Sequence, residues 1–420
     1  MISSLAGLFN IADLRKRVLF TLGMIVIFRM GAHVAVPGID AARLQALFGQ
    51  GNLLGFLDLF TGGALIKFSV FAMGIVPYIN ASIIVQLLTA VVPQLEELSK
   101  EGDSGRKQIA QYTRYLTVAL AVFQSVGMAF WLKGVLQPGY SFSFFFVSTV
   151  ISLTAGTAFI MWISELISEH GIGNGASLII FAGIVSRIPS YFGQTAMIVK
   201  GGASLIGVAV LLTVFLVMIV AIVIVQEAQR RVQVQYAKKI VGRRVYGGQS
   251  TYIPLRINQG GVIPIIFASS VLLFPATIAQ FVPNDFIRGI VGAVSPSGSF
   301  YMVFYFLLIF FFCYFYTAIT FNPTELAENI KKYGGFITGI RPGKPTADFL
   351  EYIITRLTLM GAVFLAVIAV IPSIVEGLTH ITTFQGLGAT ALLIVVGVAL
   401  DLVRQIESHL ISRQYEGLLT

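Results

Sequence analysis

Long apolar stretches separated by shorter polar ones run through the whole chain. A helix that crosses a membrane needs about 20 apolar residues, because about 30 Å of hydrocarbon is crossed at about 1.5 Å per residue. Ten stretches qualify, the fifth of them short. They are residues 18–36, 69–90, 115–133, 144–166, 174–188, 204–225, 261–281, 301–320, 357–374 and 387–403. The pattern predicts an all-α polytopic membrane protein with ten transmembrane helices.

The composition agrees with a membrane protein. Of the 420 residues, 56% are hydrophobic and only 11% are charged, whereas a soluble domain carries about 25% charged residues. The mean hydropathy of +0.86 excludes a soluble protein. Cys313 is the single cysteine, which excludes a disulfide within the chain and a cysteine-rich metal site.

The distribution of Lys and Arg between the spans predicts the orientation. With the N-terminus in the cytoplasm, the inside segments hold 21 of the 28 basic residues and the outside segments hold 6, while Arg29 lies within the first span. Positive residues favour the cytoplasmic side, so we expect residues 1–17 and the tail 404–420 to be cytoplasmic. No A-x-A-type cleavage site follows the first apolar helix, so we expect this helix to be retained.

Two segments of the chain repeat a motif. Residues 74–82 and 261–269 both fit G-[IV]-[IV]-P-x-I-x-A-S, and they open the second and seventh spans. A fainter pair, 171–179 and 386–394, fits G-[IL]-G-x-x-A-x-L-I. Chance similarity between apolar stretches is the alternative explanation. A true repeat predicts two five-helix halves, 18–188 and 204–403, joined by an external linker, 189–203.

Five spans per half is an odd number, so the second half must be inverted relative to the first. Inverted repeats place a pathway at their interface, near the middle of the bilayer. Ile79 and Ile266 occupy equivalent positions of the repeat, so we expect their side chains to face each other across a central pore. Ile75, one turn before Ile79, lies on the same helix face.

Two loops on the expected cytoplasmic side, 226–260 and 321–356, are long and basic. The alternation of Val232, Val234 and Tyr236 indicates an extended hairpin in the first loop. Their positive charge fits two interpretations. It holds the loops inside, or it provides a docking surface for an anionic partner such as ribosomal RNA or an acidic protein face.

The sequence carries no recognisable catalytic motif. G-x-S-x-G, H-E-x-x-H and Walker A sequences are absent. Residues 339–345 imitate a phosphate loop but are one residue short and lack the Ser or Thr. Four histidines lie on separate segments. We therefore expect no enzyme, no cofactor and no metal site, and we expect Arg29 to be structurally paired or to snorkel toward the membrane surface.

Several motifs resemble those of the SecY family of protein-translocation channels. The first is residues 69–88, SVFAMGIVPYINASIIVQLL. Further matches follow in family order at residues 100–106, 111–115, 171–175, 242–246, 267–270, 321–323 and 339–343. The resemblance covers essentially the whole chain. It implies two clamshell halves around an hourglass pore.

The resemblance also implies a constriction of apolar side chains within the pore. The ring positions are occupied here by Ile75, Ile79, Ile180, Ile266 and Ile394. One further ring position holds Ala176, which implies a looser ring on that side. The fainter repeat aligns Ile179, rather than Ile180, with Ile394, so the two registers differ by one residue.

A plug, a lateral gate and a docking surface are implied in the same way. The plug corresponds to residues 52–65, and a plain re-entrant or surface helix is the alternative. The gate runs between the second and seventh spans, and the docking surface binds the ribosome or a motor. The plug residues are Leu54, Phe56, Leu57, Leu59, Phe60, Gly62 and Gly63; the gate residues are Asn80, Gln86, Asn258 and Gln259; the docking residues are Arg243, Arg244 and Arg341.

The implied function is a gated conduit in the cell (inner) membrane for unfolded secretory polypeptides, with lateral release of apolar segments into lipid. The implied partners are the small subunits SecE and SecG, the SecA motor ATPase, the ribosome, signal peptides with their precursors, and membrane lipid. The alternative function is a secondary transporter of a small solute, which predicts a polar site near the middle of the membrane. Its candidate residues are Asn80, Gln86, Asn174, Asn258 and Gln259.

Overall fold

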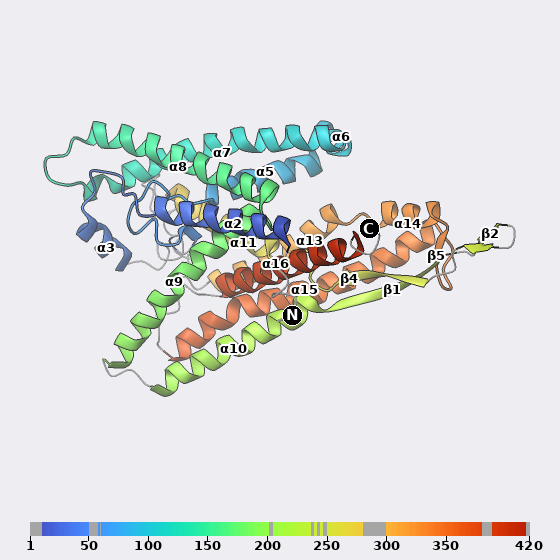
Figure 1. Cartoon of the computed structure of the whole chain (residues 1–420). Coiled ribbons are helices and arrows are strands. Elements are labelled where there is room, and N and C mark those ends of the chain that lie inside the picture. Colours follow the sequence, from blue (N-terminus) through green and yellow to red (C-terminus); the bar gives the residue numbers. More distant parts are fainter. Residues whose placement is uncertain are drawn as a thin grey trace.

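The computed structural model has one helix for each of the ten predicted spans (Figure 1). It describes residues 11–49, 58, 60–200, 205–236, 239–241, 244–246, 250–279, 300–379 and 389–416. The spanning helices are α2 (Ala12–Gly31), α5 (Val76–Val91), α7 (Asp103–Trp131), α8 (Phe142–His170), α9 (Gly175–Lys200), α10 (Leu205–Glu227), α11 (Ile263–Ala279), α13 (Tyr301–Thr320), α15 (Lys344–Thr379) and α16 (Ala389–Glu416). The prediction of ten spanning helices is confirmed.

Six of the described helices are individually long and apolar enough to cross a membrane: α7, α8, α9, α10, α13 and α15. A seventh span is formed if α5 is counted together with α6 (Pro93–Lys100), from which it is bent by 99°. α2 begins with the charged stretch Asp13–Arg17, which reduces its mean hydropathy without shortening the helix.

Two predicted boundaries are wrong. The second span was expected from residue 69, but α5 begins only at Val76, because Gly74 has a φ of +56° and Pro77 lies in the first turn. Glycine adopts this left-handed conformation without strain, whereas proline is favoured where a helix starts. The fifth span was expected to end at 188, before a linker. Instead, α9 continues through Pro189 to Lys200, so most of the expected linker is helical.

The packing of the helices repeats in the two halves. In the first half, α5 packs on α7, α7 on α8, α8 on α9, and α2 on both α8 and α9. The second half repeats each contact with the equivalent helices: α11 on α13, α13 on α15, α15 on α16, and α10 on both α15 and α16. The halves meet where α5 packs on α11 and where α9 packs on α16, and each of these pairs joins equivalent helices. This pattern is the one that an inverted five-helix repeat requires.

One buried apolar cluster fills the region between the halves. This central cluster includes Phe28 of α2, Ile160 of α8, Leu211 of α10, Ile309 of α13 and Leu365 of α15, together with residues of α5, α9, α11 and α16. A second cluster, around Phe68 and Phe145, packs the turns before α5 against α7, α8 and the short helices α3 (Ala41–Gly49) and η1 (Leu132–Val135).

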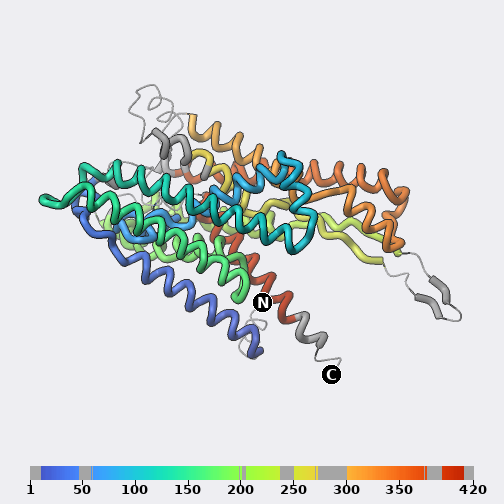
Figure 2. The backbone as a smooth tube through the Cα atoms, turned by 90° about the horizontal axis from the view of Figure 1, so that it is seen from above, coloured from blue at the N-terminus to red at the C-terminus, as the bar shows by residue number. Residues whose placement is uncertain are grey.

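The two long basic loops form a small sheet that projects beyond the helices (Figure 1, Figure 2). β1 (Gln229–Tyr236) pairs antiparallel with β4 (Ser250–Arg256), with Val232 opposite Ile253. This pairing confirms the expected hairpin. β5 (Gly335–Ile337) of the second loop pairs with the other edge of β1, giving the order β4-β1-β5, which the sequence did not predict. β2 (Lys239–Val241) and β3 (Arg244–Tyr246) pair within the first loop.

The second loop begins with a well-capped helix, α14 (Pro323–Lys332). The side chain of Asn322 accepts hydrogen bonds from the backbone amides of Thr324 and Glu325 at 3.1 and 3.3 Å. Pro323 occupies the first turn, where no amide hydrogen is needed. α14 and the first residues of α15 then pack against the sheet through a third apolar cluster that includes Val234, Ile330, Ile337 and Leu350. We call this unit the loop platform; it joins the two basic loops into one body.

Candidate channel, plug and gate

The five predicted ring residues are all buried. Ile75, Ile79, Ile180, Ile266 and Ile394 each have at most 8% of their surface exposed, and all five belong to the central cluster. They come from α5, α9, α11 and α16, with Ile75 at the residue before α5. These four helices are the ones that form the two seams between the halves. The five residues thus come from the helices that form the two seams, and their assignment to a constriction stays a prediction.

The family motif assigns Ile180 to the ring and the fainter repeat assigns Ile179, and burial does not distinguish these two alignments of α9. Ile179 and Ile180 are both 1% exposed, and both belong to the central cluster. Ala176 is half-buried against the same cluster. The assignment of Ile180 rather than Ile179 to the ring stays a prediction.

Part of the predicted plug lies in the described region. Leu54, Phe56, Leu57 and Leu59 lie outside the described residues. Phe60 is 4% exposed and belongs to the central cluster. Gly62 and Gly63 both have positive φ angles, +65° and +89°. A Cβ atom added to Gly62 would lie 2.7 Å from the Cα atom of Gly183 in α9, so this segment is held close against the backbone of α9.

A buried ion pair holds the same segment. Asp58 is 1% exposed, and its carboxylate pairs with the guanidinium of Arg187 in α9. The carboxylate also accepts a hydrogen bond from the amide of Ile66 at 2.9 Å and from the hydroxyl of Thr61 at 3.4 Å. Sequence reasoning missed this pair. A carboxylate within an otherwise apolar plug segment was the only signal, and it did not identify the partner.

Arg29 contacts the plug segment from a second helix. Its Nη1 atom donates a hydrogen bond of 2.8 Å to the backbone carbonyl of Gly62. Of the two expectations for Arg29, pairing and snorkelling, the structure shows pairing, and the acceptor is a backbone carbonyl of the predicted plug segment. Arginine from α2 and arginine from α9 thus reach the same short segment, Asp58 and residues 60–66.

The predicted gate residues lie on α5 and in the turn before α11. Asn80 is half-buried on α5, and Gln86 is exposed one and a half turns later. Asn258 is 8% exposed, and its side-chain amide donates to the carbonyl of Gly261 at 2.9 Å, just before α11. Gln259 beside it is half-buried. The structure thus brings both members of the predicted gate into contact, with Asn258 shaping the turn that begins α11.

Two of the three predicted docking arginines lie in the described part of the basic loops. Arg243 lies outside the described residues, and Arg244 begins β3. Arg341 is exposed in the turn after β5, where its backbone carbonyl accepts a hydrogen bond of 2.9 Å from the Thr346 hydroxyl. The shared apolar core of the platform fixes the second loop, with Arg341, relative to β1 of the first loop.

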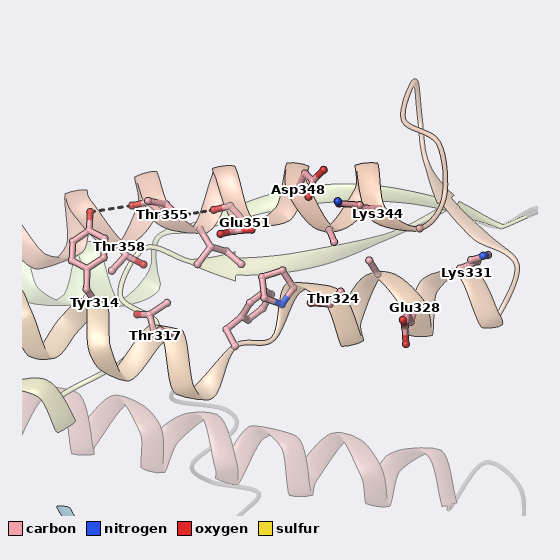
Figure 3. Close-up of a pocket in the computed structure, with 17 residues that line it drawn as sticks. Tyr314, Thr317, Thr324, Glu328, Lys331, Lys344, Asp348, Glu351, Thr355 and Thr358 are labelled. Carbon is pink, nitrogen blue, oxygen red and sulfur yellow. Dashed lines mark hydrogen bonds between the residues drawn. The ribbon is translucent and has the colours of Figure 1, made fainter. Parts of the chain in front are cut away.

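Two cavities lie at the end of the molecule that carries the loop platform. One, of about 700 Å³, lies between α13, α14 and α15, with Lys331, Lys344, Glu328 and Glu351 along its walls (Figure 3). The other, of about 910 Å³, lies between α5, α6, α13 and α14. In its wall Lys100 donates a 2.7 Å hydrogen bond to Glu96, which raises the pKa of Lys100.

Two of the five amides proposed for a small-solute site make local contacts instead. Asn174 is exposed, and its side chain accepts a hydrogen bond from the Ser177 amide at 3.1 Å, so it caps the start of α9. Asn258 fixes the turn before α11. Among the described residues, no group of three or more His, Cys, Asp or Glu side chains is placed to hold a metal ion.

The fold and the buried cluster together define a membrane channel of two inverted helical halves, with an apolar core between them. The family model that matches, SecY, covers residues 69–403. The chain is 48% identical over 419 residues to "Protein translocase subunit SecY" of Synechococcus elongatus, which covers 97% of this chain and 95% of that protein. The protein of the same name from Thermotoga maritima is 45% identical over 422 residues, 98% of this chain and 96% of that protein. The chain belongs to the SecY family.

Solved structures show the same fold at low sequence identity. "The structure of a protein conducting channel" matches with a TM-score of 0.68 and 19% identity, over 95% of this chain and 93% of that chain. A structure entitled "Sec61 in the Canine ribosome-channel complex from the endoplasmic reticulum" matches with a TM-score of 0.64 and 17% identity, over 95% and 93% of the two chains.

Proposed function

We propose that the chain is a channel through which unfolded secretory polypeptides cross the membrane, with lateral release of apolar segments into lipid. The observation that carries this proposal is the burial, in one apolar cluster, of five isoleucines from the four helices that form the seams. A small-solute site would instead need fixed polar groups at this position. Full-length similarity to proteins named as protein translocase subunits supports the same function.

The isoleucine ring suits a polypeptide of any sequence. Branched aliphatic side chains can close around an extended chain and offer it no hydrogen bonds, so the passing chain is not bound tightly. When the channel is empty, a narrow apolar constriction dewets and blocks ions. A ring of Ile75, Ile79, Ile180, Ile266 and Ile394 would thus limit ion flow through the resting channel, together with the plug segment.

The seam between α5 and α11 provides the lateral exit. Separation of these two helices would open the pore toward lipid, with Asn80, Gln86, Asn258 and Gln259 along or beside the opening. Entry of an apolar segment into the bilayer is then driven by its transfer free energy, about −0.5 kcal/mol for each Leu or Ile near the bilayer centre. The channel then needs only to separate α5 from α11, because the transfer free energy of the segment drives its entry into lipid.

The energy for transport comes from partners in this proposal. The sequence carries no nucleotide-binding motif, so a motor such as SecA or a translating ribosome supplies the push. Two neighbours in fold carry titles that describe ribosome complexes. Arg243, Arg244 and Arg341, on the side with most of the Lys and Arg, would bind such a partner, while SecE and SecG complete the complex.

The halves 18–188 and 204–403 would lie in the cell membrane with residues 1–17 and 404–420 in the cytoplasm. This orientation places the loop platform and its basic residues, with both cavities, on the cytoplasmic side, where precursors and motors are. The plug segment then lies on the outer side of the ring.

Protease protection tests the proposed function. Proteoliposomes would contain this chain, SecE, SecA, ATP and a secretory precursor. We expect precursor to become protease-resistant only when both ATP and this chain are present. If no protection develops while SecA hydrolyses ATP and the chain is folded, the channel function is wrong. Uptake of small solutes by the same vesicles would then support the transporter alternative.

A further inference from the structure

The pair Asp58–Arg187 is unusual for its surroundings. Asp58 is 1% exposed and the side chain of Arg187 is 20% exposed, in a region of apolar helices. Moving two charges out of water is costly, and removal of one partner leaves the other charge buried without compensation. The pair therefore stabilises only conformations in which the plug segment lies against α9.

The geometry of α9 matches the plug segment at two points. Gly183 and Arg187 are four residues apart, so they lie on the same face of the helix, one turn from each other. The backbone of Gly62 approaches Gly183, and Asp58 reaches Arg187. Arg187 is further positioned by the ring of Tyr191, whose centroid lies 5.7 Å from the guanidinium carbon. The close backbone contact of Gly62 and the ion pair of Asp58 thus both hold the plug segment against the same face of α9.

A third contact comes from another helix of the same half. Arg29 of α2 donates to the Gly62 carbonyl at 2.8 Å. The plug segment is thus held between α2 and α9, both of which belong to the first half. Neither contact crosses the seam between α5 and α11, so the segment can stay docked or leave independently of a partial opening of that seam.

We propose that Asp58 and Arg187 form a charge latch, assisted by Arg29, that holds the plug segment in the closed position and sets how easily the channel opens. This inference rests on the proposed function, because it assigns the segment the role of a plug. Undocking separates two buried charges and breaks the contact with Arg29. After transit, the free charge on Arg187 attracts Asp58 and favours reclosure.

Conductance of the resting channel tests the latch. The variants are Asp58→Asn, Arg187→Gln, their double, Arg187→Lys as the conservative change, and Lys67→Gln as a control. Lys67 is exposed in the same segment, so Lys67→Gln removes one charge without touching the latch. Planar bilayers containing the complex with SecE, without precursor or motor, report the ion leak.

A second readout is the rate at which a thiol reagent labels Ala64→Cys, in a Cys313→Ala background. Ala64 is fully buried in the docked segment.

We expect Asp58→Asn and Arg187→Gln each to raise the resting conductance and the labelling rate by about tenfold or more, because each leaves one buried charge unpaired. The double variant should leak less than the product of the two single effects, since paired residues are not additive. Arg187→Lys should remain near the wild type, and Lys67→Gln should equal it.

Single variants that leak and label like the wild type would overturn the latch, and so would a double variant whose effect is the product of the singles. The same vesicles, supplied with SecA, ATP and precursor, keep this result separate from the proposed function. Wild-type channels that protect no precursor would count against the channel function. Variants that protect precursor yet show no coupling would count against the latch alone.

Discussion

At the scale of single residues, the contact between Gly62 and α9 depends on the absence of a side chain. A Cβ atom at Gly62 would lie 2.7 Å from Gly183 Cα and 2.8 Å from the Arg29 guanidinium. Gly63 also has a positive φ, but the nearest atom to its added Cβ is Arg187 Nη1 at 3.6 Å. A side chain at either glycine would strain the backbone, but only one at Gly62 would also clash with α9. Comparing substitutions at the two positions therefore distinguishes the effect of the clash from the effect of the strain.

We predict that Gly62→Ala undocks the plug segment and that Gly63→Ala does so much less. Both substitutions pay for a left-handed backbone, about 1 kcal/mol, but only Gly62→Ala also displaces α9 or Arg29. Resting conductance in planar bilayers should rise several-fold more for Gly62→Ala. Equal conductance of the two variants would show that the close approach to Gly183 does not hold the segment.

The isoleucine ring makes a second prediction at this scale. Ile79→Gly with Ile266→Gly should raise the resting ion conductance several-fold, because a wider constriction stays wet. The matched control is Ile83→Gly with Leu272→Gly, which makes the same kind of change one to two turns further along α5 and α11, at buried positions of the same cluster. A control pair that leaks as much as the ring pair would contradict the ring assignment.

The sequence predicted some of these residues and not others, for physical reasons. Ile79 and Ile266 follow from the repeat, because equivalent residues of an inverted pair must approach a common axis. Asp58 and Arg187 do not, because no period relates a residue of an irregular segment to one far along the chain. Sequence analysis identified Arg29 as a buried charge but not its acceptor, since the partner is a backbone carbonyl that any residue could supply.

At the scale of elements, helices were predicted better than their ends. Apolar length identifies each span, since every spanning segment must satisfy its backbone hydrogen bonds internally. It does not locate the start of α5, because the turns between residues 61 and 75 are as apolar as the helix that follows. The hairpin of β1 and β4 followed from alternation. The pairing of β5 with β1 did not, because three residues carry too little pattern.

The loop platform supplies the prediction at this scale. Val234 is 1% exposed, on β1 opposite Ile337 of β5. Val234→Asp places a charge in the core that the two loops share, so the platform should lose its fixed arrangement. Motor-driven protection of precursor should fall several-fold, while resting conductance stays at the wild-type level because the ring lies elsewhere.

Gln233→Asp is the matched control, since Gln233 is the neighbouring strand residue and its side chain is exposed. It adds the same charge to β1 without entering the core. Equal transport by the two variants would show that the arrangement of the loops does not matter for the motor. A rise in leak with Val234→Asp would indicate a wider loss of structure instead.

At the scale of the whole molecule, the two seams are unequal. The contact between α9 and α16 is more extensive than the contact between α5 and α11. α9 is also followed directly in the chain by α10, which itself packs on α16. The side of α9, α10 and α16 therefore has both covalent and packing connections between the halves, and the side of α5 and α11 has packing alone. Movement of the halves should pivot on the first side and open the second.

Arg404 strengthens the first side. Its guanidinium donates to the carbonyl of Gln226 at 2.7 Å and pairs with Glu227 at 2.9 Å, which ties α16 to the end of α10. Positive charge at this position complements the carbonyl end of α10. Among the described residues, no ion pair joins α5 to α11 in this way.

If the seam between α5 and α11 is the one that opens, short and long crosslinks between these two helices should have different effects on lateral release. Ser82 and Ser269 occupy equivalent positions of the repeat on α5 and α11, so cysteines there, in a Cys313→Ala background, can be joined by bifunctional reagents. A short reagent should hold the seam closed and prevent a signal-anchor segment from reaching lipid, as measured by photocrosslinking to lipid. A long reagent should leave this step near the untreated level, which controls for the substitutions and for modification of the two thiols. Equal lipid crosslinking with the short and the long reagent would show that apolar segments leave the channel elsewhere. The assignment of a hinge to α9, α10 and α16 would then be wrong as well.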